Sequence, residues 1–589
     1  MAQPYGSLVE LLDASARAHA QKPLFGSKIG GAWRWITYDE FRKDVDRFQS
    51  ALAQLGVGRG DRVGIVGQNS VEWAITAYAA ATRGAAFVPL YEEQGPAEWE
   101  YILRDAAPRV VVAANRATHD QLVTLRPRLP SVECVLGIGL ADTDPASFRS
   151  HLVRGGANPA AGVLPRPEDL ATILYTSGTT GVPKGVELTH QNLCSNVAAL
   201  TGLFPYGPDE RSLAFLPWAH SFGQTAELHA LLSIGASLAI NDAPDRLLEN
   251  LEKVRPTVLY AVPRVFHRIH DGVAQDLRAV PAALRAVYET GLAAAARRAR
   301  GESLGLPGRA ALAAADRLVF SRIRARLGGR LRWVVSGSAA LPLHIAALID
   351  AIGVPVYEGY GLTETSPVAT TNRPGARRLG TVGQAIPGVR IELLAAAEPT
   401  DGSGEIVVHG PNVMRGYHGL PDETARVLTA EGGLRTGDLG RLDAEGYLTI
   451  TGRLKELYKL ENGRYVAPAP LEDALRASPY FANVMLHGEN RPWNVAILVL
   501  NDAAVRAWAA DAGLSIGELA TDDHVQALVD RELRRLSEPF KAFERPEGFV
   551  IAREPFTVEN GTLTPTLKVK RSRVVERYRA ELDRVYASR

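Results

Sequence analysis

The chain has 589 residues, of which 46% are apolar and 22% are charged. A chain of this length and composition predicts a globular protein of about two to four domains, each with a sizeable core. The formal net charge of +1 argues against a protein that binds nucleic acid through bulk charge. We therefore expect no nucleic-acid partner.

Three features of the sequence bear on cellular location. The two cysteines, Cys134 and Cys194, lie far apart without metal-type spacing, which predicts buried thiols in a reducing compartment. Residues 1–5 lack the basic region and apolar core of a secretory signal. The most apolar stretch, 74–91, is interrupted at 82–84 by Thr-Arg-Gly, so it is shorter than the about 18 apolar residues that would span a bilayer. We expect a cytoplasmic protein.

Strand-like and helix-like segments alternate through the N-terminal three quarters of the chain. Buried strands are predicted at 61–67, 86–88, 110–113 and 172–175, with a helix at 71–82. This alternation predicts an α/β fold with parallel sheets covered by helices. A further strand at 331–335 runs into a tight loop at 336–339, the kind of strand edge at which open α/β sheets bind ligands.

Two later stretches have a different character. Residues 264–332 contain fourteen arginines against five acidic residues, on Ala- and Leu-rich segments that predict helices. The clearest domain boundary lies near 452–455. After it, helices at 471–478 and 523–538 and strands at 483–487 and 494–500 predict a small α+β domain.

Residues 175–185 read Tyr-Thr-Ser-Gly-Thr-Thr-Gly-Val-Pro-Lys-Gly. Glycines let backbone N–H groups approach an anion, hydroxyls add donors and lysine adds charge, so this segment predicts a phosphate-binding loop. It is not the usual P-loop, in which glycine precedes the lysine and Ser or Thr follows it, because Pro183 and Gly185 flank Lys184. A Ser/Thr/Gly-rich surface loop is the alternative interpretation.

Four further motifs follow in order, at 360–365 (Tyr-Gly-Leu-Thr-Glu-Thr), 434–439 (Leu-Arg-Thr-Gly-Asp-Leu), 452–456 (Gly-Arg-Leu-Lys-Glu) and 565–568 (Pro-Thr-Leu-Lys). Together with 175–185 they resemble the signatures of the adenylate-forming superfamily, which includes acyl-CoA synthetases, firefly-type luciferases and the adenylation domains of peptide synthetases. The resemblance covers nearly the whole chain. It implies a large N-terminal domain of β-sheets covered by helices at 1–452, a hinge at 453–455 and a small mobile α+β C-terminal domain at 456–589.

The resemblance also implies that ATP converts a carboxylate to an acyl-adenylate, a reaction that needs groups for triphosphate, Mg²⁺ and adenosine. Glu364 is the expected Mg²⁺ ligand, together with Thr176, because hard cations prefer oxygen ligands. The expected catalytic residues are Lys568, Thr363, Glu364 and His220. The residues expected to bind ATP are Thr176, Ser177, Gly178, Thr179, Thr180, Gly181, Lys184, Gly337, Ser338, Ala339, Glu358, Gly359, Tyr360, Gly361, Asp438 and Arg453.

Several of these residues have expected roles. Thr363 resembles an α-phosphate contact, and His220 resembles the histidine near the reacting carboxylate. Tyr360 resembles the ring that stacks on adenine, with residues 337–339 closing the other face. Asp438 resembles the residue that accepts both ribose hydroxyls, a role suited to an acceptor-only carboxylate, and Arg453 would add a second ribose contact. Without the motifs, a core tyrosine, a turn aspartate or a structural histidine would be the ordinary interpretation.

The small domain is expected to supply different groups to two half-reactions. In one orientation it inserts Lys568 for adenylation; in the other it brings in the loop after the hinge residue Lys455 and opens a tunnel for the CoA thiol. That loop carries Lys459 and Gly463 on the CoA side, and also Glu461, where relatives often have Ser or Gly. Leu567 replaces the glycine that precedes the catalytic lysine in most of the superfamily, which leaves Lys570 as an alternative.

The basic stretch 264–332 resembles the helical insertion of long-chain acyl-CoA synthetases. We therefore expect a long-chain fatty acid–CoA ligase that uses ATP, fatty acid, CoA and Mg²⁺, with peripheral membrane contact through the insertion as a hypothesis. One alternative is a fatty acyl-AMP ligase that loads a carrier protein. Another is a non-catalytic nucleotide-binding relative. No feature of the sequence favours an oxygen-dependent, luciferase-like activity.

Overall fold

The computed structural model describes residues 4–587 except 178–181, 264, 267–268, 270–271, 273–279, 300–301, 340, 396–401, 558 and 564–568. The chain forms two compact units. The first comprises Met1–Glu392, Val407–Thr436 and Asp443–Leu448, and the second comprises Leu393–Ile406, Gly437–Leu442 and Thr449–Arg589.

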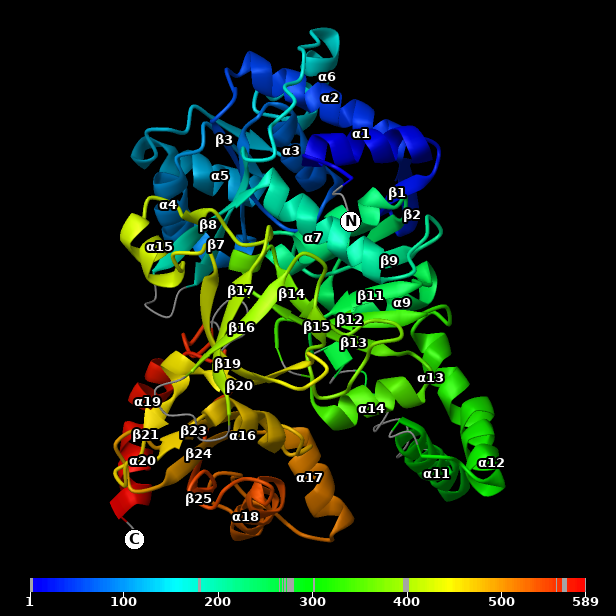
Figure 1. Ribbon diagram of the computed structural model, residues 1–589, viewed down its shortest axis with the longest axis vertical. Helices are drawn as coiled ribbons and strands as arrows, with labels where there is room; N and C mark the ends of the chain where they lie inside the picture. The colour runs from blue at the N-terminus through cyan, green and yellow to red at the C-terminus, as the bar shows by residue number, and fades with distance from the viewer. Residues whose placement is uncertain are drawn as a thin grey trace. The chain divides into compact units, whose positions relative to one another are not determined.

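A seven-stranded sheet in the first unit has the strand order β18-β8-β7-β4-β3-β5-β6. Figure 1 labels its strands β3, β7 and β8. Its strands are β3 (Arg62–Val66), β4 (Ala86–Leu90), β5 (Val110–Ala113), β6 (Cys134–Gly137), β7 (Leu170–Ser177), β8 (Pro183–Thr189) and β18 (Gly416–Tyr417). Strands β3 to β7 pair in parallel, as predicted, but β8 and β18 pair antiparallel. The expectation of a purely parallel sheet is wrong at this edge, because β7 and β8 are too close in sequence for a crossover of a dozen or more residues.

Helices cover this sheet because their apolar faces find partners on it. The helices of this part are α1 (Leu8–His19), α2 (Tyr38–Gln54), α3 (Val71–Thr82), α4 (Gly95–Ala106), α5 (Arg116–Leu125), α6 (Phe148–Ala157) and α7 (His190–Leu203). Helix α3 has the predicted bounds, and Ser70 caps it by accepting a hydrogen bond from the Trp73 N–H at 3.0 Å. It contacts α1, α2, β3 and β4, which explains why it is apolar on nearly every side.

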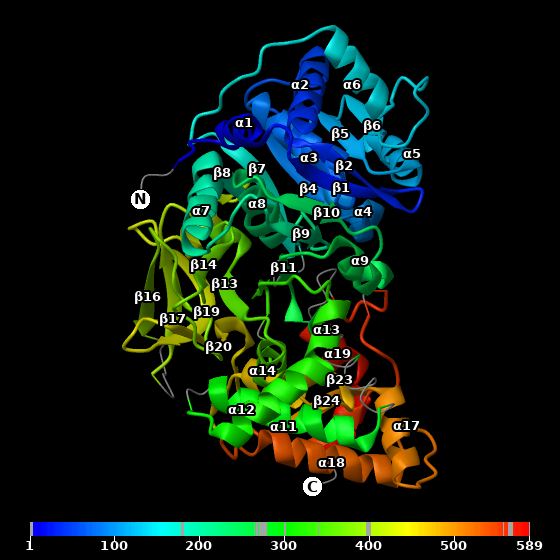
Figure 2. The same cartoon turned by 90° about the vertical axis from the view of Figure 1, so that its right-hand side faces the viewer.

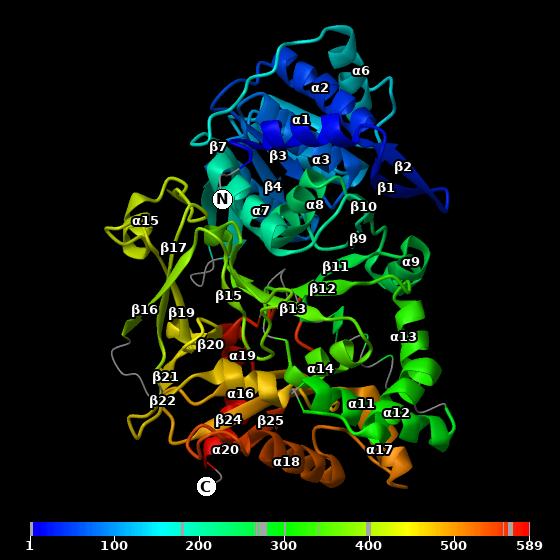
Figure 3. The same ribbon diagram turned by 45° about the vertical axis from the view of Figure 1, so that its right-hand side comes forward.

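Two further mixed sheets complete most of the first unit. One has the order β2-β1-β10-β9 and consists of β1 (Pro23–Ile29), β2 (Ala32–Thr37), β9 (Arg211–Ala214) and β10 (Ser237–Ile240) (Figure 2). The other has the order β11-β12-β13-β14-β15 and consists of β11 (Val258–Ala261), β12 (Trp333–Ser336), β13 (Val356–Gly361), β14 (Val368–Thr371) and β15 (Gln384–Ala385) (Figure 3). In the second of these sheets, β11, β12 and β13 are parallel and the last two pairings are antiparallel.

The described part of the basic stretch 264–332 is largely helical and lies in sequence between β11 and β12. Its helices are α11 (Ala282–Ala299), α12 (Leu306–Ala315) and α13 (Ser321–Arg326), with a π-helical turn at Asp316–Phe320. Helix α11 packs against α12 and α14 (Leu343–Ala351) (Figure 3). A Cβ on Gly291 would lie 2.1 Å from the Ala315 Cβ, so a glycine is needed where these helices approach most closely.

The remaining elements of the first unit are a π-helix (Phe222–His229), α8 (Ala230–Ser233), α9 (Leu247–Val254) and α15 (Pro421–Val427). The division into two units falls in a part of the chain that contains four further strands. They are β16 (Arg390–Ala395), β17 (Gly404–His409), β19 (Leu434–Leu442) and β20 (Leu448–Arg453).

The second unit contains the α+β arrangement expected for the C-terminal region. Its three-stranded sheet, in the order β23-β24-β25, consists of β23 (Phe481–His487), β24 (Asn494–Leu500) and β25 (Pro546–Ile551), and β21 (Tyr458–Lys459) forms a hairpin with β22 (Tyr465–Val466). The helices are α16 (Pro468–Leu475), α17 (Asp502–Asp511), α18 (Asp523–Ser537), α19 (Arg571–Arg577) and α20 (Arg579–Ala587). Helices α16 and α18 contact each other and share a core with β23 and β24.

Candidate functional site

The predicted phosphate-binding segment is built largely from strands. Thr176 on β7 lies directly opposite Lys184 on β8, and Ser177 lies opposite Pro183. The prediction of one loop over 175–185 is therefore wrong at both ends, because antiparallel pairing extends the strands into the motif and proline is tolerated at the first position of a strand. Gly178, Thr179, Thr180, Gly181 and the Ser177 side chain lie outside the described residues.

Tyr417 connects Lys184 to Glu364. The Tyr417 hydroxyl donates a hydrogen bond to the Glu364 Oε1 at 2.8 Å, and the Lys184 Nζ lies 5.2 Å from the centre of the Tyr417 ring. Burial and the neighbouring Glu364 raise the pKa of Tyr417, so the hydroxyl remains a donor at neutral pH. The Lys184 Nζ also forms an ion pair with the Glu423 Oε2 at 2.6 Å.

The turn that carries Thr363 and Glu364 is fixed by a steric constraint. It follows β13 as a 3-10 turn, Thr363–Thr365. A Cβ on Gly361 would lie 1.7 Å from the Pro367 carbonyl oxygen, so only glycine fits there. The Leu362 N–H donates to the Thr365 Oγ1 at 2.9 Å. The turn also contacts β8, which brings the Mg²⁺ candidate Glu364 close to the strand of Lys184.

His220 and Thr363 come from distant segments that meet in space. The hydroxyls of Ser221 and Thr363 lie 3.2 Å apart, which places the residue after His220 next to the predicted α-phosphate contact. The His220 Nδ1 accepts a hydrogen bond from the Phe222 N–H at 3.2 Å, so a neutral His220 carries its proton on Nε2. The structure thus places the segment that carries His220 next to Thr363.

The predicted adenine-binding residues lie at the carboxyl ends of adjacent parallel strands. Ser336 at the end of β12 is in register with Glu358 on β13. The segment 337–339 therefore leaves the sheet beside residues 359–361, which continue β13 and pair with β14, at the edge where α/β sheets bind ligands. Ser338 has a φ of 69°, and Tyr360 is in register with Thr370 on β14.

Glu358 is a buried carboxyl group next to this edge. It is 7% exposed, and its Oε2 accepts a hydrogen bond from the Leu341 N–H at 3.3 Å. The other oxygen has no hydrogen-bond partner among the described residues. Burial raises the pKa of Glu358 to about 7 against the opposing effects of the Leu341 N–H and Arg377, so the group is partly protonated at neutral pH.

Within the second unit, the two predicted ribose-binding residues contact each other. The Arg453 Nε donates to the Asp438 Oδ1 at 2.6 Å, and the Asp438 side chain is only 4% exposed. The guanidinium compensates the buried carboxylate and fixes its orientation. A carboxylate is an acceptor-only group, which suits a partner for sugar hydroxyls.

The hinge and the CoA-side loop have defined conformations in the second unit. Lys455 lies in a 3-10 turn, Leu454–Glu456. Lys459 pairs with Tyr465 across the β21–β22 hairpin, and its Nζ lies 5.3 Å from the Tyr465 ring centre. Gly463 has a φ of +83°, a conformation that favours glycine in this turn. The Glu461 N–H donates to the Arg491 carbonyl oxygen at 3.0 Å.

The expected catalytic Lys568 lies outside the described residues, but the chain on both sides of it is described. Leu563 and Val569 form an isolated antiparallel bridge, and the Lys570 N–H donates to the Thr562 carbonyl oxygen at 2.8 Å. The alternative, Lys570, is exposed and directly precedes α19.

Sequence reasoning missed Tyr417 and Glu423. They lie on β18 and α15, far along the chain from Lys184, and no motif marks them. Only the antiparallel pairing of β18 with β8, in which Tyr417 is opposite Val186, brings them to the candidate site. One signal in the sequence could have pointed to Tyr417, since a buried tyrosine hydroxyl usually finds a hydrogen-bond partner. This preference does not identify the partner.

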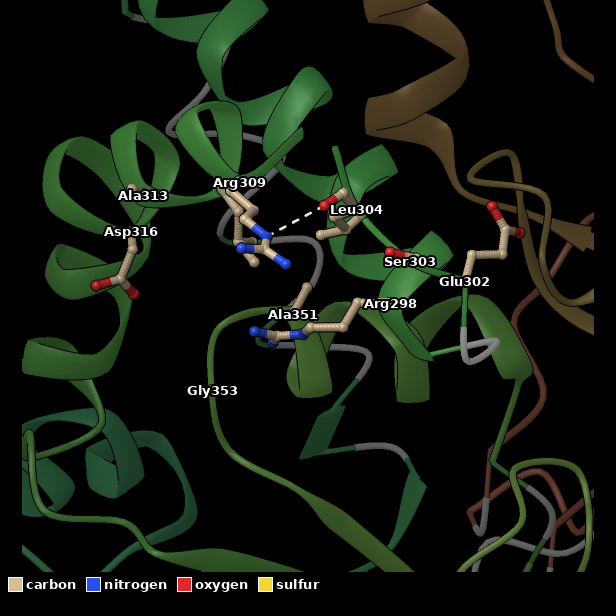
Figure 4. Close-up of a pocket in the computed structure, with 10 residues that line it drawn as sticks. Arg298, Glu302, Ser303, Leu304, Arg309, Ala313, Asp316, Ala351 and Gly353 are labelled. Carbon is tan, nitrogen blue, oxygen red and sulfur yellow. Dashed lines mark hydrogen bonds between the residues drawn. The ribbon is translucent and has the colours of Figure 1, made fainter. Parts of the chain in front are cut away.

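A separate cavity of about 550 Å³ lies among the helices of the basic stretch (Figure 4). Figure 4 shows Arg298 and Arg309 reaching into it from α11 and α12, where the Arg309 Nε donates to the Leu304 carbonyl oxygen at 3.1 Å. Its lining consists of Arg298, Glu302, Ser303, Leu304, Arg309, Leu312, Ala313, Asp316, Ala351 and Gly353. None of the residues expected to bind ATP is among them.

The chain matches family profiles over most of its length. A profile described as AMP-binding enzyme matches residues 12–418, and one described as AMP-binding enzyme C-terminal domain matches 456–589. A long-chain-fatty-acid–CoA ligase of Mycobacterium bovis is 33% identical over 95% of this chain and 93% of its own length. The long chain acyl-CoA synthetase 7 of Arabidopsis thaliana is 30% identical over 99% of this chain and 86% of its own length.

Solved structures share the fold. MatB from Rhodopseudomonas palustris with bound ATP has a TM-score of 0.73 and 25% identity, with coverage of 97% of this chain and 99% of that chain. The adenylation domain of a carboxylic acid reductase from Segniliparus rugosus, in complex with AMP, has a TM-score of 0.79 and 22% identity, with coverage of 99% and 94%.

Proposed function

Because the chain belongs to the AMP-binding enzyme family, we propose that it is an ATP-dependent long-chain fatty acid–CoA ligase. ATP and a fatty acid form an acyl-adenylate and pyrophosphate, and CoA then displaces AMP to give acyl-CoA. The observation that carries this proposal is the full-length similarity, at 30–33% identity, to relatives named for long-chain acyl-CoA synthesis. The assembly of Lys184, Tyr417 and Glu364 supports it.

In this proposal the first unit binds the triphosphate and the reacting carboxylate. Lys184 and the hydroxyls near it hold the β- and γ-phosphates, and Thr363 contacts the α-phosphate. His220 lies near the fatty acid carboxylate as it attacks the α-phosphorus. Of these groups, Lys184 is fixed in advance by strand pairing and Thr363 by turn geometry, so these two stabilise developing charge without reorganising.

Mg²⁺ fits the donors present. Glu364 offers a carboxylate oriented by Tyr417, and Thr176 offers a hydroxyl. No group of three or more His, Cys, Asp and Glu side chains that could hold a metal occurs among the described residues. This suits Mg²⁺, which protein sites usually bind through one or two carboxylates together with substrate phosphates. When bound, Mg²⁺ would neutralise phosphate charge.

The two half-reactions would use different faces of the small domain. We assign residues 1–452 to the large domain, 453–455 to the hinge and 456–589 to the small domain. Tyr360 with residues 337–339 would hold adenine, and Asp438 with Arg453 would hold the ribose. Lys568 would serve adenylation, and after rotation at Lys455 the loop with Lys459, Glu461 and Gly463 would face CoA.

In this proposal the protein is cytoplasmic. The basic helices of 264–332 would contact the membrane from which an amphiphilic fatty acid comes. None of the described helices is long and apolar enough to cross a membrane. A peripheral contact would depend on the exposed arginines of α11 and α12.

A carboxylate panel tests the proposed function. Acids from acetate to about C20, and aromatic acids, are compared by AMP formation with and without CoA, and acyl-CoA is identified by mass spectrometry. Chains of about C12–C18 should give the highest kcat/KM, because each buried methylene contributes up to about 0.8 kcal/mol until the pocket ends. Equal efficiency with acetate or an aromatic acid would refute the long-chain assignment.

The same assay distinguishes the alternatives. Acyl-adenylate formation without any acyl-CoA would support the alternative of a ligase that loads a carrier protein. No pyrophosphate release with any acid would support a non-catalytic nucleotide-binding protein.

A further inference from the structure

The cavity of about 550 Å³ among α11, α12 and α14 is separate from every residue expected to bind ATP. Its walls come from these three helices and from residues 302–304, which lie between α11 and α12. Its volume is within the range of small-molecule sites, and its lining combines apolar side chains with a few polar groups, as such sites usually do. The cavity is therefore a candidate ligand site of its own.

Two positive charges face this cavity. Arg298 on α11 and Arg309 on α12 reach into it (Figure 4). The two carboxylates of the lining, Glu302 and Asp316, pair with other arginines at 2.8 and 2.6 Å, and Figure 4 shows them apart from the two guanidinium groups. In the part of the chain that the structure describes, no ion pair involves Arg298 or Arg309. Like charges that share a cavity repel each other, so the cavity favours an anionic ligand.

The orientation of the guanidinium groups suits an anion with several oxygen atoms. The Arg309 Nε donates to the Leu304 carbonyl oxygen at 3.1 Å, which orients the group and leaves N–H donors on both terminal nitrogens. Guanidinium groups bind phosphate through two parallel N–H···O bonds, and a phosphate monoester offers three strong acceptor oxygens. The exposed Ser303 lies in the same lining. Phosphate is therefore the anion that these donors fit best.

The rest of the lining is apolar. Leu304 is 8% exposed and Ala351 is 5% exposed, and the partly buried Leu312 packs against the core that contains Ala351. Ala313 also lines the cavity. Inorganic phosphate would leave this apolar surface in contact with water, whereas an apolar group attached to the phosphate would cover it and gain the free energy of burial. The lining therefore favours a phosphate ester over free phosphate.

We propose that the cavity between α11, α12 and α14 binds a phosphate ester that carries an apolar group. Arg298 and Arg309 hold the phosphate, and Leu304, Leu312 and Ala351 contact the apolar group. The inference goes beyond the proposed function, because that function assigns no substrate to this cavity, and a test of binding needs no turnover. A shaped site also differs from a membrane contact through exposed arginines, since it distinguishes ligands of equal charge. A lipid headgroup and a soluble phosphate ester share the required chemistry.

Isothermal titration calorimetry of the full-length protein with monomeric dihexanoyl phosphatidic acid tests this site. Glycerol 3-phosphate is the same kind of ester without acyl chains, and dihexanoyl phosphatidylcholine has the same chains without net charge. The variants are Arg298→Gln, Arg309→Gln and Ala313→Phe, which fills the cavity and leaves its charge unchanged. Arg317→Gln is the matched control, because Arg317 is exposed, lies in the same helical stretch and does not line the cavity. Circular dichroism verifies folding.

We expect saturable binding of dihexanoyl phosphatidic acid, and binding of the two comparison compounds at least about tenfold more weakly, because each lacks one half of the contacts. Arg298→Gln and Arg309→Gln should each weaken binding about 10- to 100-fold, since hydrogen bonds between charged groups contribute on this scale. Ala313→Phe should weaken it at least about tenfold, because its ring occupies the space of the ligand. Arg317→Gln should change it less than about threefold, since solvent screens a charge outside the site.

Absence of saturable binding to the wild type would overturn the inference. Equal weakening by Arg317→Gln, or unchanged binding in a folded Ala313→Phe variant, would also overturn it, because either result would indicate attraction to diffuse surface charge. If Ala313→Phe does not fold, Ala313→Leu takes its place.

Sedimentation with phosphatidic acid vesicles identifies the source of the ligand. If the cavity variants weaken vesicle binding together with binding of the monomeric ester, the ligand is a lipid headgroup. If they weaken only binding of the monomeric ester, the ligand is a soluble phosphate ester.

Discussion

Tyr417 connects two side chains whose motifs are far apart in the sequence. Its hydroxyl orients Glu364, the candidate Mg²⁺ ligand, and its ring faces Lys184. Tyr417→Phe keeps the ring and removes the hydroxyl. Because a hydrogen bond to a charged group contributes about 1.5–3 kcal/mol, we expect adenylation to slow by about tenfold or more and to need more Mg²⁺ for half its maximal rate.

A Mg²⁺ titration of adenylation measures this effect. Tyr101→Phe is the control, because Tyr101 is 38% exposed and its hydroxyl donates to a backbone carbonyl, that of Pro183 at 3.1 Å, rather than to a carboxylate. If the two variants have the same Mg²⁺ dependence, the role assigned to Tyr417 is wrong.

Lys568 and Lys570 compete for one catalytic role. A cation at the α-phosphate is needed only while the transition state carries extra charge, and removal of such a donor costs about 2.7–4 kcal/mol, or about 10²–10³ in rate. Lys568→Ala should therefore nearly abolish adenylation but still convert supplied acyl-adenylate and CoA at a near-normal rate. Separate assays of the two half-reactions test this. A selective defect in Lys570→Ala instead would assign the role to Lys570.

The raised pKa of Glu358 makes the free energy of unfolding depend on pH. Its folded pKa is about 7 against an ordinary value of 4.5, so folding favours the protonated form. The stability that Glu358 adds to the folded state in its protonated form is fully present below about pH 4.5 and is lost as pH rises through about 7. Relative to Glu358→Gln, the wild type should therefore lose about 3 kcal/mol of unfolding free energy between pH 4.5 and pH 8.

Urea unfolding at several pH values measures this difference. The matched control is Glu252→Gln, the same substitution at an exposed position of α9. A constant difference between wild type and Glu358→Gln over the same range would show that Glu358 ionises normally in the folded protein.

The basic helices α11 to α13 are the elements proposed to contact the membrane, and substitution of arginines in this stretch tests that contact. Each basic residue near an anionic surface contributes about 1 kcal/mol. The triple variant Arg298→Glu, Arg309→Glu and Arg317→Glu should therefore bind anionic vesicles at least about 100-fold more weakly than the wild type at low salt. Sedimentation with phosphatidylserine vesicles at low and high salt measures this binding.

Three exposed arginines elsewhere provide the control for charge. The variant Arg104→Glu, Arg116→Glu and Arg506→Glu changes the net charge equally but lies outside the insertion. It should bind vesicles nearly as well as the wild type. Equal weakening in both triple variants, or no binding by the wild type at low salt, would reject contact through the insertion.

At the scale of the whole molecule, the proposed rotation depends on Lys455. Lys455→Pro fixes φ near −65° and removes an N–H, which hinders the backbone change at the hinge. If the variant remains in the adenylation orientation, it should form acyl-adenylate at a near-normal rate and slow thioester formation by at least about tenfold. The two half-reaction assays measure this, with Lys455→Ala as the control that keeps backbone freedom.

A Lys455→Pro variant that carries out both half-reactions at wild-type rates would contradict the hinge assignment. A variant defective only in adenylation would place the resting orientation on the CoA side. Either result leaves the family membership unchanged, because that membership does not depend on the rotation.

The sequence alone indicated the family, the α/β class and several core elements, among them β3, β4, β5, β7 and α3, because motif spacing and apolar periodicity are local properties of the chain. Helix α3 has its predicted bounds, and the C-terminal α+β pattern appears as expected. Only the tertiary structure decided which side chains meet. Strand pairing turned the ends of the 175–185 motif into β7 and β8 and placed Tyr417 beside Lys184. Such contacts join residues distant in the chain, so local sequence pattern does not encode them.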